Sequence, residues 1–597
     1  MKLSVVIPTF NRRDVLGRTL ASIAAQDFPP KNLEVIVVMD GSTDGTAEFL
    51  SSFTLECSFH ALTAPHRGAG AARNVGIRAA TGELVLLLDD DIIAPPDLLR
   101  KHCSAHSDCE CCVVHGPLYI ASSSSNTILR HVLELRCGDY YRDLDPKSQL
   151  RYPEEIASSI AVLSALANSS MPRDLLLRCG GFDEQILAGE DLELGLRLWK
   201  AGATFRYLPE AVAYEHHVKP SRQYLERQAK ALGADDIIIS RKHPEYRPYS
   251  LLSRFAEVSI LKKWAWKVIA SLPISLATLV SFPLRFERWF YRSTPLRDIG
   301  VRLMRVAESI TQLRSALAVV GSWKALEAEF DRRLPILMYH HVGPSRPGAY
   351  PSLTVSPALF ERQIRWLARL GYTGISPSQW LHWRKSGTGL PNRPVLITFD
   401  DAYQDIAEHA LPVLRRFGFS GAVYTVTGRF GSTNTWDEAD GCGTLNLMTA
   451  EQIRYWAENG IEFGAHSRTH ADLTKLSLAD CRAEIIGSKN DLADLLGSPI
   501  VSFAYPFGEY NDAVHDIVRE QFGLGLSTHQ GMNYLRTDPH LLRRAYISPN
   551  DGLIGFLINV WWGGQERINS WRVKLRARTR FKRILGVFHV KTEKGPL

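Results

Sequence analysis

The chain has 597 residues, of which 45% are hydrophobic and 22% charged, a balance that excludes a wholly disordered protein and predicts more than one folded domain. Nine cysteines without a pairing pattern do not make a disulfide framework, which favours a reducing compartment, and the net charge of +7 is modest. The segment MKLSVVIPTFNRRD has too short an apolar run for a signal peptide, so we expect synthesis into the cytoplasm.

The first 235 residues alternate short apolar runs with helical patterns. LSVVIPTF, EVIVVMD and ELVLLLDDD are typical of buried strands, and DVLGRTLASIAAQ between two of them is typical of a helix. This alternation predicts an α/β domain whose mostly parallel sheet is covered on both faces.

Polar residues follow these strands where each one ends. The first strand ends at Thr9, the second at Asp40 and the third in the cluster Asp89–Asp91. Such a carboxylate cluster suits a divalent cation that bridges a diphosphate, although a solvated acidic loop is the alternative. RGAGAARNVG is not a dinucleotide fingerprint, because Arg73 stands where the third glycine belongs, and this disfavours NAD binding.

Together with GGFDE at 180–184 and GEDLELGLRLWKAG at 189–202, these stretches resemble family 2 glycosyltransferases of the GT-A fold. The resemblance covers about residues 1–220 and implies an inverting transfer from a nucleotide sugar. It implies that Asp191 is the base for the acceptor hydroxyl and that Asp89 and Asp91 hold Mg²⁺ or Mn²⁺. The donor contacts that it implies are Thr9, Asp40, Arg73, Asp89 and Glu190.

Other features of this half leave alternatives open. His216 or His217 adds a metal ligand or is only a strand-end pair, and HCSAHSDCECC at 102–112 has no regular zinc spacing. The Gln-x-x-Arg-Trp motif of processive synthases is missing, which favours the addition of one or a few sugars. A nucleotidyltransferase is a weaker reading, because no basic phosphate-binding loop follows the first strand.

Residues 236–333 lose the strand–helix alternation and are rich in Trp, Leu and Arg, which predicts a helical connector. VIASLPISLATLVSFPL at 268–284 is only 17 residues long, contains two prolines and has basic residues on both flanks. We expect a membrane-surface or re-entrant segment, with a span or a buried helix as alternatives. The basic stretch SWRVKLRARTRFKRILGVFHVK in the tail, 551–597, fits anionic headgroups better than nucleic acid.

The α/β alternation resumes at residue 334 and continues to about 550. VLITFDD places Asp400 and Asp401 at the end of a strand, and His466 and His470 follow another strand in H-x-x-x-H spacing. Two histidines and one carboxylate with an open position form a common catalytic zinc set. Unrelated histidines are the alternative, but the strand-end aspartates favour a metal site.

TFDD, HSRTH and FAYPFG, in this order, resemble the NodB-type polysaccharide deacetylases of carbohydrate esterase family 4. The resemblance implies a distorted (β/α) barrel that removes N-acetyl groups from amino sugars, with Asp400 as the general base. It implies that Asp401, His466 and His470 bind Zn²⁺ or another divalent transition metal, and that Tyr505 lines the substrate groove and offers its backbone N–H to the oxyanion.

This domain also departs from the family pattern. The arginine of the third motif is absent, and the leucine–x–histidine motif that carries the general acid is not found. His340, His341 and His529 are candidates for the acid, but each is better explained as a structural or substrate-lining residue. The general acid therefore stays unassigned.

The leading hypothesis is a bifunctional enzyme with a glycosyltransferase domain at 1–235, a connector at 236–333, a deacetylase domain at 334–550 and a basic tail. The alternative is that only one half is catalytic and the other binds carbohydrate or acts as a scaffold. The expected partners are a nucleotide-sugar donor, an N-acetylated amino-sugar glycan or lipid-linked acceptor, and a membrane surface, but not nucleic acid. We expect both domains in the cytoplasm at the inner face of the membrane.

Overall fold

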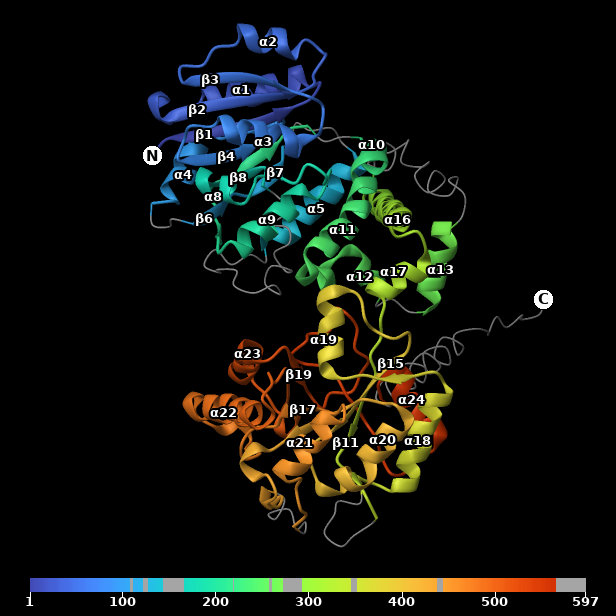
Figure 1. Ribbon diagram of the computed structural model, residues 1–597. Coiled ribbons are helices and arrows are strands. Elements are labelled where there is room, and N and C mark those ends of the chain that lie inside the picture. The colour runs from blue at the N-terminus through green and yellow to red at the C-terminus, as the bar shows by residue number, and fades with distance from the viewer. Residues whose placement is uncertain are drawn as a thin grey trace, which may run out of the picture. The chain divides into compact units, whose positions relative to one another are not determined.

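The computed structural model describes residues 1–107, 111–121, 127–142, 166–217, 220–256, 260–271, 293–344, 352–436 and 444–564. The chain divides into two compact units, Met1–Leu326 and Glu327–Leu597. Each unit has its own sheet and core (Figure 1).

The first unit is built on a seven-stranded sheet in the order β3-β2-β1-β4-β8-β6-β9. β3, β2, β1 and β4 are parallel, whereas β8 is antiparallel to both of its neighbours. The strands are β1 (Leu3–Thr9), β2 (Leu33–Asp40), β3 (Ser58–Ala64), β4 (Leu84–Leu88), β6 (Cys112–His115), β8 (Asn168–Pro172) and β9 (Thr204–Tyr207). A second sheet has the order β5-β10-β7, with β5 (Ile92–Ile93), β10 (Ala213–Glu215) and β7 (Leu118–Ile120).

Helices cover both faces of the seven-stranded sheet. Along β1, Val5 and Ile7 belong to one buried cluster and Val6 to another, because successive side chains of a strand point to opposite faces. This explains why the central strands are apolar at nearly every position. The helices are α1 (Arg13–Ala24), α2 (Thr46–Ser52), α3 (Ala69–Ala79), α4 (Leu98–Ser104), α5 (Ile128–Arg142), α8 (Arg173–Arg178) and α9 (Glu190–Lys200).

The described residues of the predicted connector, 236–333, are mostly helical, and most of them belong to the first unit (Figure 1). Its longest helix, α16, lies against α11, where Gly233 leaves no room for a side chain: a Cβ there would lie 2.1 Å from the carbonyl oxygen of Gln312. α10 (Ser221–Tyr224) precedes the predicted connector and α11 (Lys230–Lys242) begins before it; the helices within it are α12 (Leu251–Ala256), α13 (Ile260–Ser271), α16 (Thr294–Val320) and α17 (Trp323–Phe330).

None of the helices within the described ranges is both long enough and apolar enough to cross a bilayer. Residues 272–284 of the predicted membrane-surface segment and the basic stretch of the tail lie outside those ranges.

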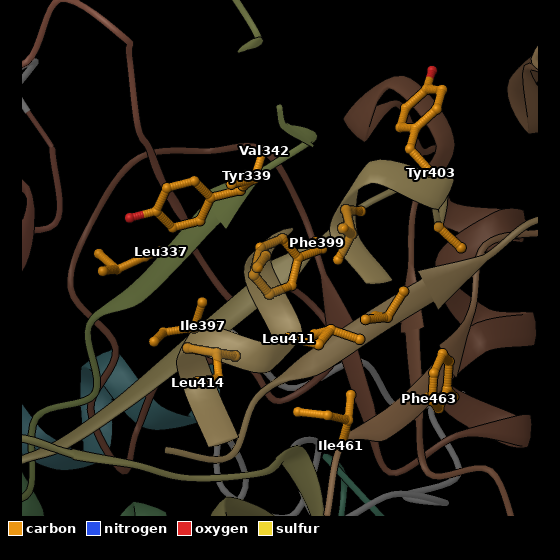
Figure 2. Close-up of a cluster of buried hydrophobic side chains, with 14 of the residues drawn as sticks. Leu337, Tyr339, Val342, Ile397, Phe399, Tyr403, Leu411, Leu414, Ile461 and Phe463 are labelled. Atoms are coloured by element: carbon orange, nitrogen blue, oxygen red, sulfur yellow. The ribbon is translucent and has the colours of Figure 1, made fainter. Parts of the chain in front are cut away.

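The second unit contains a curled parallel sheet in the order β19-β18-β17-β16-β15-β11-β20, with β14 also paired to β15. Figure 2 shows part of its core, where side chains of β11 and β15 lie near Leu411 and Leu414 of α20. The strands are β11 (Ile336–Tyr339), β14 (Thr373–Gly374), β15 (Pro394–Phe399), β16 (Ala422–Thr425), β17 (Glu462–Ala465), β18 (Ser502–Ala504), β19 (Leu524–Leu526) and β20 (Ala545–Tyr546).

Helices follow most of these strands, as expected for a β/α barrel. α18 is a typical example: Ser356 caps its first turn by accepting from Leu359 N, and Pro357 occupies the first helical position. The helices are α18 (Pro357–Arg369), α19 (Pro377–Ser386), α20 (Leu411–Phe417), α21 (Ala450–Glu458), α22 (Leu478–Leu496), α23 (Asp512–Gln521) and α24 (Leu553–Trp562).

Candidate active sites

The second unit brings Asp401, His466 and His470 together at the carboxyl ends of its parallel strands. Each side chain offers one ligand atom, and the three atoms lie within 4.8 Å of one another in a buried position. Asp401 Oδ1 lies 3.4 Å from Nε2 of His466 and 3.2 Å from Nε2 of His470, yet it forms no hydrogen bond. A buried acceptor facing two imidazole nitrogens without hydrogen-bond geometry fits a shared cation.

The two histidines are held differently. Nδ1 of His466 lies 2.8 Å from the carbonyl oxygen of Ala504, a contact that fixes the ring and leaves Nε2 free for a metal. The ring of His470 stacks on Trp436 and meets Phe507 in an edge-on contact, with centroid distances of 4.6 and 4.5 Å.

Backbone strain is concentrated at this site. Asp401, Ala402, Ser467, His470 and Phe507 all have positive φ angles, between 55° and 66°. The left-handed region costs a non-glycine residue roughly 1–3 kcal/mol, so it persists only where the surroundings impose it. Because of the turn after β15, the side chains of the adjacent aspartates face different partners: Asp401 faces the two histidines, whereas Asp400 faces Arg544.

Asp400 is held by Arg544, a residue that the sequence analysis did not identify. Nη1 and Nη2 of Arg544 donate to the two carboxylate oxygens at 2.6 and 2.8 Å, and both side chains are buried. Nε of Arg544 donates to Ser527 O at 2.9 Å. Burial raises the pKa of Asp400, but the charges of Arg544, His466 and His340 and the hydrogen bonds from Arg544 together outweigh it, so the pKa is lowered overall.

In the first unit, β1, β2 and β4 are neighbours in the sheet, so the polar residues at their ends gather at one edge. Nη1 of Arg12 lies 2.6 Å from Asp90 Oδ1 and 2.9 Å from Asp91 Oδ2. Thr9 Oγ1 donates to Asp90 Oδ2 at 2.8 Å. Burial and the neighbouring carboxylates raise the pKa of Asp91 to about 7 despite Arg12.

Arg73 joins this aspartate cluster to the first turn of α9. Its Nη2 lies 2.6 Å from Asp89 Oδ1, and its Nη1 lies 3.2 Å from Glu190 Oε1 and 3.6 Å from Asp191 Oδ1. Asp191 Oδ1 is buried and forms no hydrogen bond. Burial raises the pKa of Asp191 to about 8 although Arg73 opposes the shift. A carboxylate with a pKa near neutrality can both take up and release a proton.

Asp40 is already engaged by the loop after β3. Its carboxylate accepts from the backbone N–H groups of Arg67 and Gly68 at 2.8 and 3.0 Å, and Nδ1 of His66 lies 2.9 Å from Oδ2. The His66 ring stacks on Phe10 at a centroid distance of 4.0 Å.

Comparison with known proteins agrees with this division of the chain. Residues 4–161 match the family model described as glycosyl transferase family 2, residues 84–296 match glycosyl transferase family group 2, and residues 388–524 match polysaccharide deacetylase. The chain joins a family 2 glycosyltransferase domain to a polysaccharide deacetylase domain. Both are families of enzymes.

Individual relatives match one half each. The validoxylamine A glucosyltransferase of Streptomyces hygroscopicus subsp. limoneus is 30% identical over 271 residues, 41% of this chain, and the chain spans 58% of that relative. The solved structure of the Streptococcus pyogenes deacetylase PplD is 29% identical, with a TM-score of 0.33, and the match covers 37% of this chain and 94% of PplD. The mannosyltransferase PcManGT of Pyrobaculum calidifontis is 20% identical, with a TM-score of 0.36, and covers 54% of this chain and 87% of its own.

The predicted role of Tyr505 in the deacetylase domain does not agree with the structure. Its side chain is fully buried, and its hydroxyl donates to the carbonyl oxygen of His540 at 2.9 Å. Its backbone N–H donates to Leu526 O at 3.1 Å, because β18 pairs with β19. Neither group is free to contact a substrate, whereas Phe507, two residues later, is 52% exposed.

Two candidates for the general acid of the deacetylase domain, His341 and His340, differ in their contacts. Nδ1 of His341 lies 3.0 Å from Asp405 Oδ2, and its ring packs on Tyr403, so it has a structural role. His340 lies close enough to Asp400 and Asp401 for both charges to act on it, although burial lowers its pKa, and its Nδ1 is buried without a hydrogen-bond partner.

The remaining histidines of the glycosyltransferase domain show no metal cluster in the part of the chain that the structure describes. His102 lies 2.9 Å from the hydroxyl oxygen of Ser170 through Nδ1, and His106 lies 2.8 Å from it through Nε2, deep in the core. Burial lowers the pKa of both rings to about 4, so both are neutral core residues. His216 lies beside the aspartate cluster, where its backbone N–H donates to Asp91 O at 2.9 Å.

Proposed function

We propose that the chain is a bifunctional enzyme that transfers a sugar from a nucleotide-sugar donor and removes N-acetyl groups from an amino-sugar glycan. The observation that supports this most strongly is that each unit has its own carboxylate, buried in the case of Asp400 and partly buried in the case of Asp191, beside a set of groups able to bind substrate or cation. Asp400 lies beside Asp401 and the two histidines, and Asp191 lies beside Arg73 and the aspartate cluster.

In the deacetylase domain, Asp401, His466 and His470 would hold Zn²⁺ or another divalent transition metal. The bound cation would supply Lewis acidity for the amide carbonyl and for an attacking water. Asp400 takes the proton from that water, and Arg544 keeps its carboxylate ionised and oriented. The oxygen of that water bonds to the carbonyl carbon, the C–N bond then breaks, and acetate and the free amine leave after the nitrogen takes up the proton that Asp400 removed.

The aromatic residues around His470 support a sugar substrate. Trp436 and the exposed Phe507 present flat apolar surface beside the metal ligands. Such rings pack against the apolar face of a pyranose while polar groups bind its hydroxyls. An N-acetylated amino sugar would place its amide at the metal and its ring against these side chains.

In the glycosyltransferase domain, Asp191 takes the proton of the acceptor hydroxyl as the oxygen attacks the anomeric carbon. The nucleotide diphosphate leaves from the opposite face, so the configuration inverts. Asp89 and Asp91 would hold Mg²⁺ or Mn²⁺, whose charge would offset that of the diphosphate. Thr9 hydrogen-bonds to Asp90, and Glu190 accepts from Arg73, so that both partners are held in place. Asp40 and the stacked rings of Phe10 and His66 offer a site for the nucleobase.

We also propose that the protein works at the cytoplasmic face of a membrane, on a lipid-linked or small glycan. Trp264 of α13 is 66% exposed, and Ile554 and Trp561 of α24 are 76% and 44% exposed. α24 carries no charged residue and is followed in sequence by the basic stretch of the tail. Exposed tryptophan beside basic residues is typical of a membrane-surface contact.

The test is to incubate the purified chain with a panel of nucleotide sugars and, separately, with chito-oligosaccharides. Release of nucleotide diphosphate in the first series and of acetate in the second would support both activities. Activity in one series alone would favour the alternative, in which the other half binds carbohydrate or acts as a scaffold.

A further inference from the structure

A buried carboxylate of α11 holds the loop that leads into α9, the helix whose first turn carries Asp191. Oδ2 of Asp235 accepts three consecutive backbone N–H groups, from Leu187 at 3.0 Å, Ala188 at 2.7 Å and Gly189 at 3.2 Å. Asp235 is only 3% exposed. These are charge-assisted hydrogen bonds in a dry environment, which are stronger than neutral ones.

The same loop depends on Asp235 because α9 lacks a cap of its own. Its N-cap residue is Gly189, which has no side chain to accept from the first turn. Gly189 also permits close approach to α11: a Cβ at this position would lie 2.8 Å from Cδ1 of Ile239. The start of the base-bearing helix is therefore fixed from outside, by residues of α11.

Contacts farther along α11 hold other parts of the same region. Lys242 forms an ion pair with Asp183, in the turn before the loop. His243, directly after α11, lies 3.0 Å from Glu193 in the first turn of α9 through its Nε2. α11 is in turn packed against α16 at Gly233. The chain of contacts leads from the long connector helix to the first turn of α9.

We propose that Asp235 is a positioning residue for sugar transfer, which orients Asp191 by fixing the loop Leu187–Gly189 from α11. This inference rests on the proposed function of the first unit, in which Asp191 is the base. Asp235 does not contact the donor or acceptor in this account. It acts because a general base works only when its oxygen is within hydrogen-bond reach of the proton that it takes.

The adjacent residue provides a matched control. Asp236 is equally buried and lies on the same helix, but it accepts from Tyr246 Oη at 2.8 Å and from the backbone N–H of Leu251 and Leu252 at 3.3 Å. Asp236→Ala therefore removes a comparable buried carboxylate that fixes α12 and not the loop before α9.

The experiment compares Asp235→Ala, Asp235→Asn and Asp236→Ala in the full chain, using release of nucleotide diphosphate from the most active nucleotide sugar of the panel. Asp235→Ala should lower kcat roughly 100-fold, as expected for a misplaced catalytic group, with the KM for the donor unchanged. Asp235→Asn keeps an oxygen acceptor and should recover most of the rate, and Asp236→Ala should keep a normal kcat per folded molecule.

Hydrogen exchange of the backbone amides gives a readout independent of turnover. Exchange at 187–189 should rise in Asp235→Ala and stay low in Asp236→Ala, where 251–252 should exchange faster. If Asp235→Ala does not fold, Gly189→Ala tests the same point, because its Cβ pushes the loop away from Ile239 and should lower kcat while the donor KM is kept.

Three results would overturn the inference. They are a normal kcat in Asp235→Ala or in a folded Gly189→Ala, an equal loss in Asp236→Ala, or unchanged exchange at 187–189 in a folded Asp235→Ala. No turnover by the unmodified chain with any nucleotide sugar would refute the proposed transferase function itself, and the positioning role with it. Faster exchange at 187–189 in Asp235→Ala would then show only that Asp235 stabilises this loop.

Discussion

Replacing Arg544 by methionine tests the most unexpected contact of the deacetylase site. The guanidinium is 0% exposed and donates to both oxygens of Asp400, which is itself 3% exposed. Methionine removes the charge and the donors, so Asp400 becomes a buried carboxylate without its partner. Breaking a buried ion pair from one side costs about 3–5 kcal/mol, and we expect the free energy of unfolding of the second unit to fall by that amount.

Hydrogen exchange of the backbone amides in the full chain measures this change at β15, which ends directly before Asp400, and at β20, which begins directly after Arg544. The double variant Asp400→Asn, Arg544→Met removes both charges and should recover part of the loss, because no uncompensated charge remains. Arg384→Met is the control: Arg384 is another buried arginine, but it donates to the carbonyl oxygen of Leu535 at 2.7 Å and not to Asp400.

Turnover adds a second readout. Asp400 should lose its orientation in Arg544→Met, and acetate release should fall about 10²–10⁴-fold, the usual contribution of a positioned general base. Metal binding should persist, because Asp401 and the histidines are untouched. Unchanged exchange at β15 together with normal acetate release in Arg544→Met would refute the argument that Arg544 holds the base.

The remaining predictions concern both domains. Asp401→Ala should abolish metal binding in equilibrium dialysis, whereas Asp400→Asn should keep the metal and lose acetate release; equal metal loss in both would contradict the division of roles. Asp191→Asn should bind the donor normally in titration calorimetry while transfer falls about 10²–10⁴-fold, and normal transfer would remove Asp191 from the mechanism. The ion pair of His243 and Glu193 should make stability depend on pH. Burial opposes both charges, but Glu193 together with Glu245 raises the pKa of His243 above 6.5, and His243 together with Arg197 lowers the pKa of Glu193 from 4.5 to about 2. Its contribution is therefore full between about pH 4.5 and 6.5, lost at higher pH as His243 deprotonates and lost toward pH 2 as Glu193 protonates; a pH series of urea unfolding in the wild type and His243→Gln should differ most inside that window.

Much of the architecture could be predicted because it depends on local patterns. The apolar runs of β1, β2 and β15 and the polar residues after them stand together in the sequence. The order of the strands then brings those strand ends to one edge of each sheet. The set of Asp401, His466 and His470 follows from the same reasoning, since β15 and β17 are separated only by β16.

Contacts between residues far apart in the chain could not be predicted. Arg544 lies 144 residues after Asp400, and no motif around it indicates that it pairs with an aspartate. The error at Tyr505 has a related cause: whether its N–H is free depends on the register of β18 against β19, which no local pattern specifies. The role of Asp235 could not be predicted because its partners are three backbone N–H groups, which every residue except proline has, so no residue type marks the contact in the sequence.

The central claim is that the two halves carry separate catalytic centres, and one measurement tests it most directly. Nucleotide diphosphate release and acetate release are measured side by side on the full chain and on its Asp191→Asn and Asp401→Ala variants. Our account predicts that Asp191→Asn loses only sugar transfer and that Asp401→Ala loses only acetate release. Two results would contradict it. One is normal sugar transfer in Asp191→Asn together with normal acetate release in Asp401→Ala, and the other is loss of both activities in both variants although both fold normally.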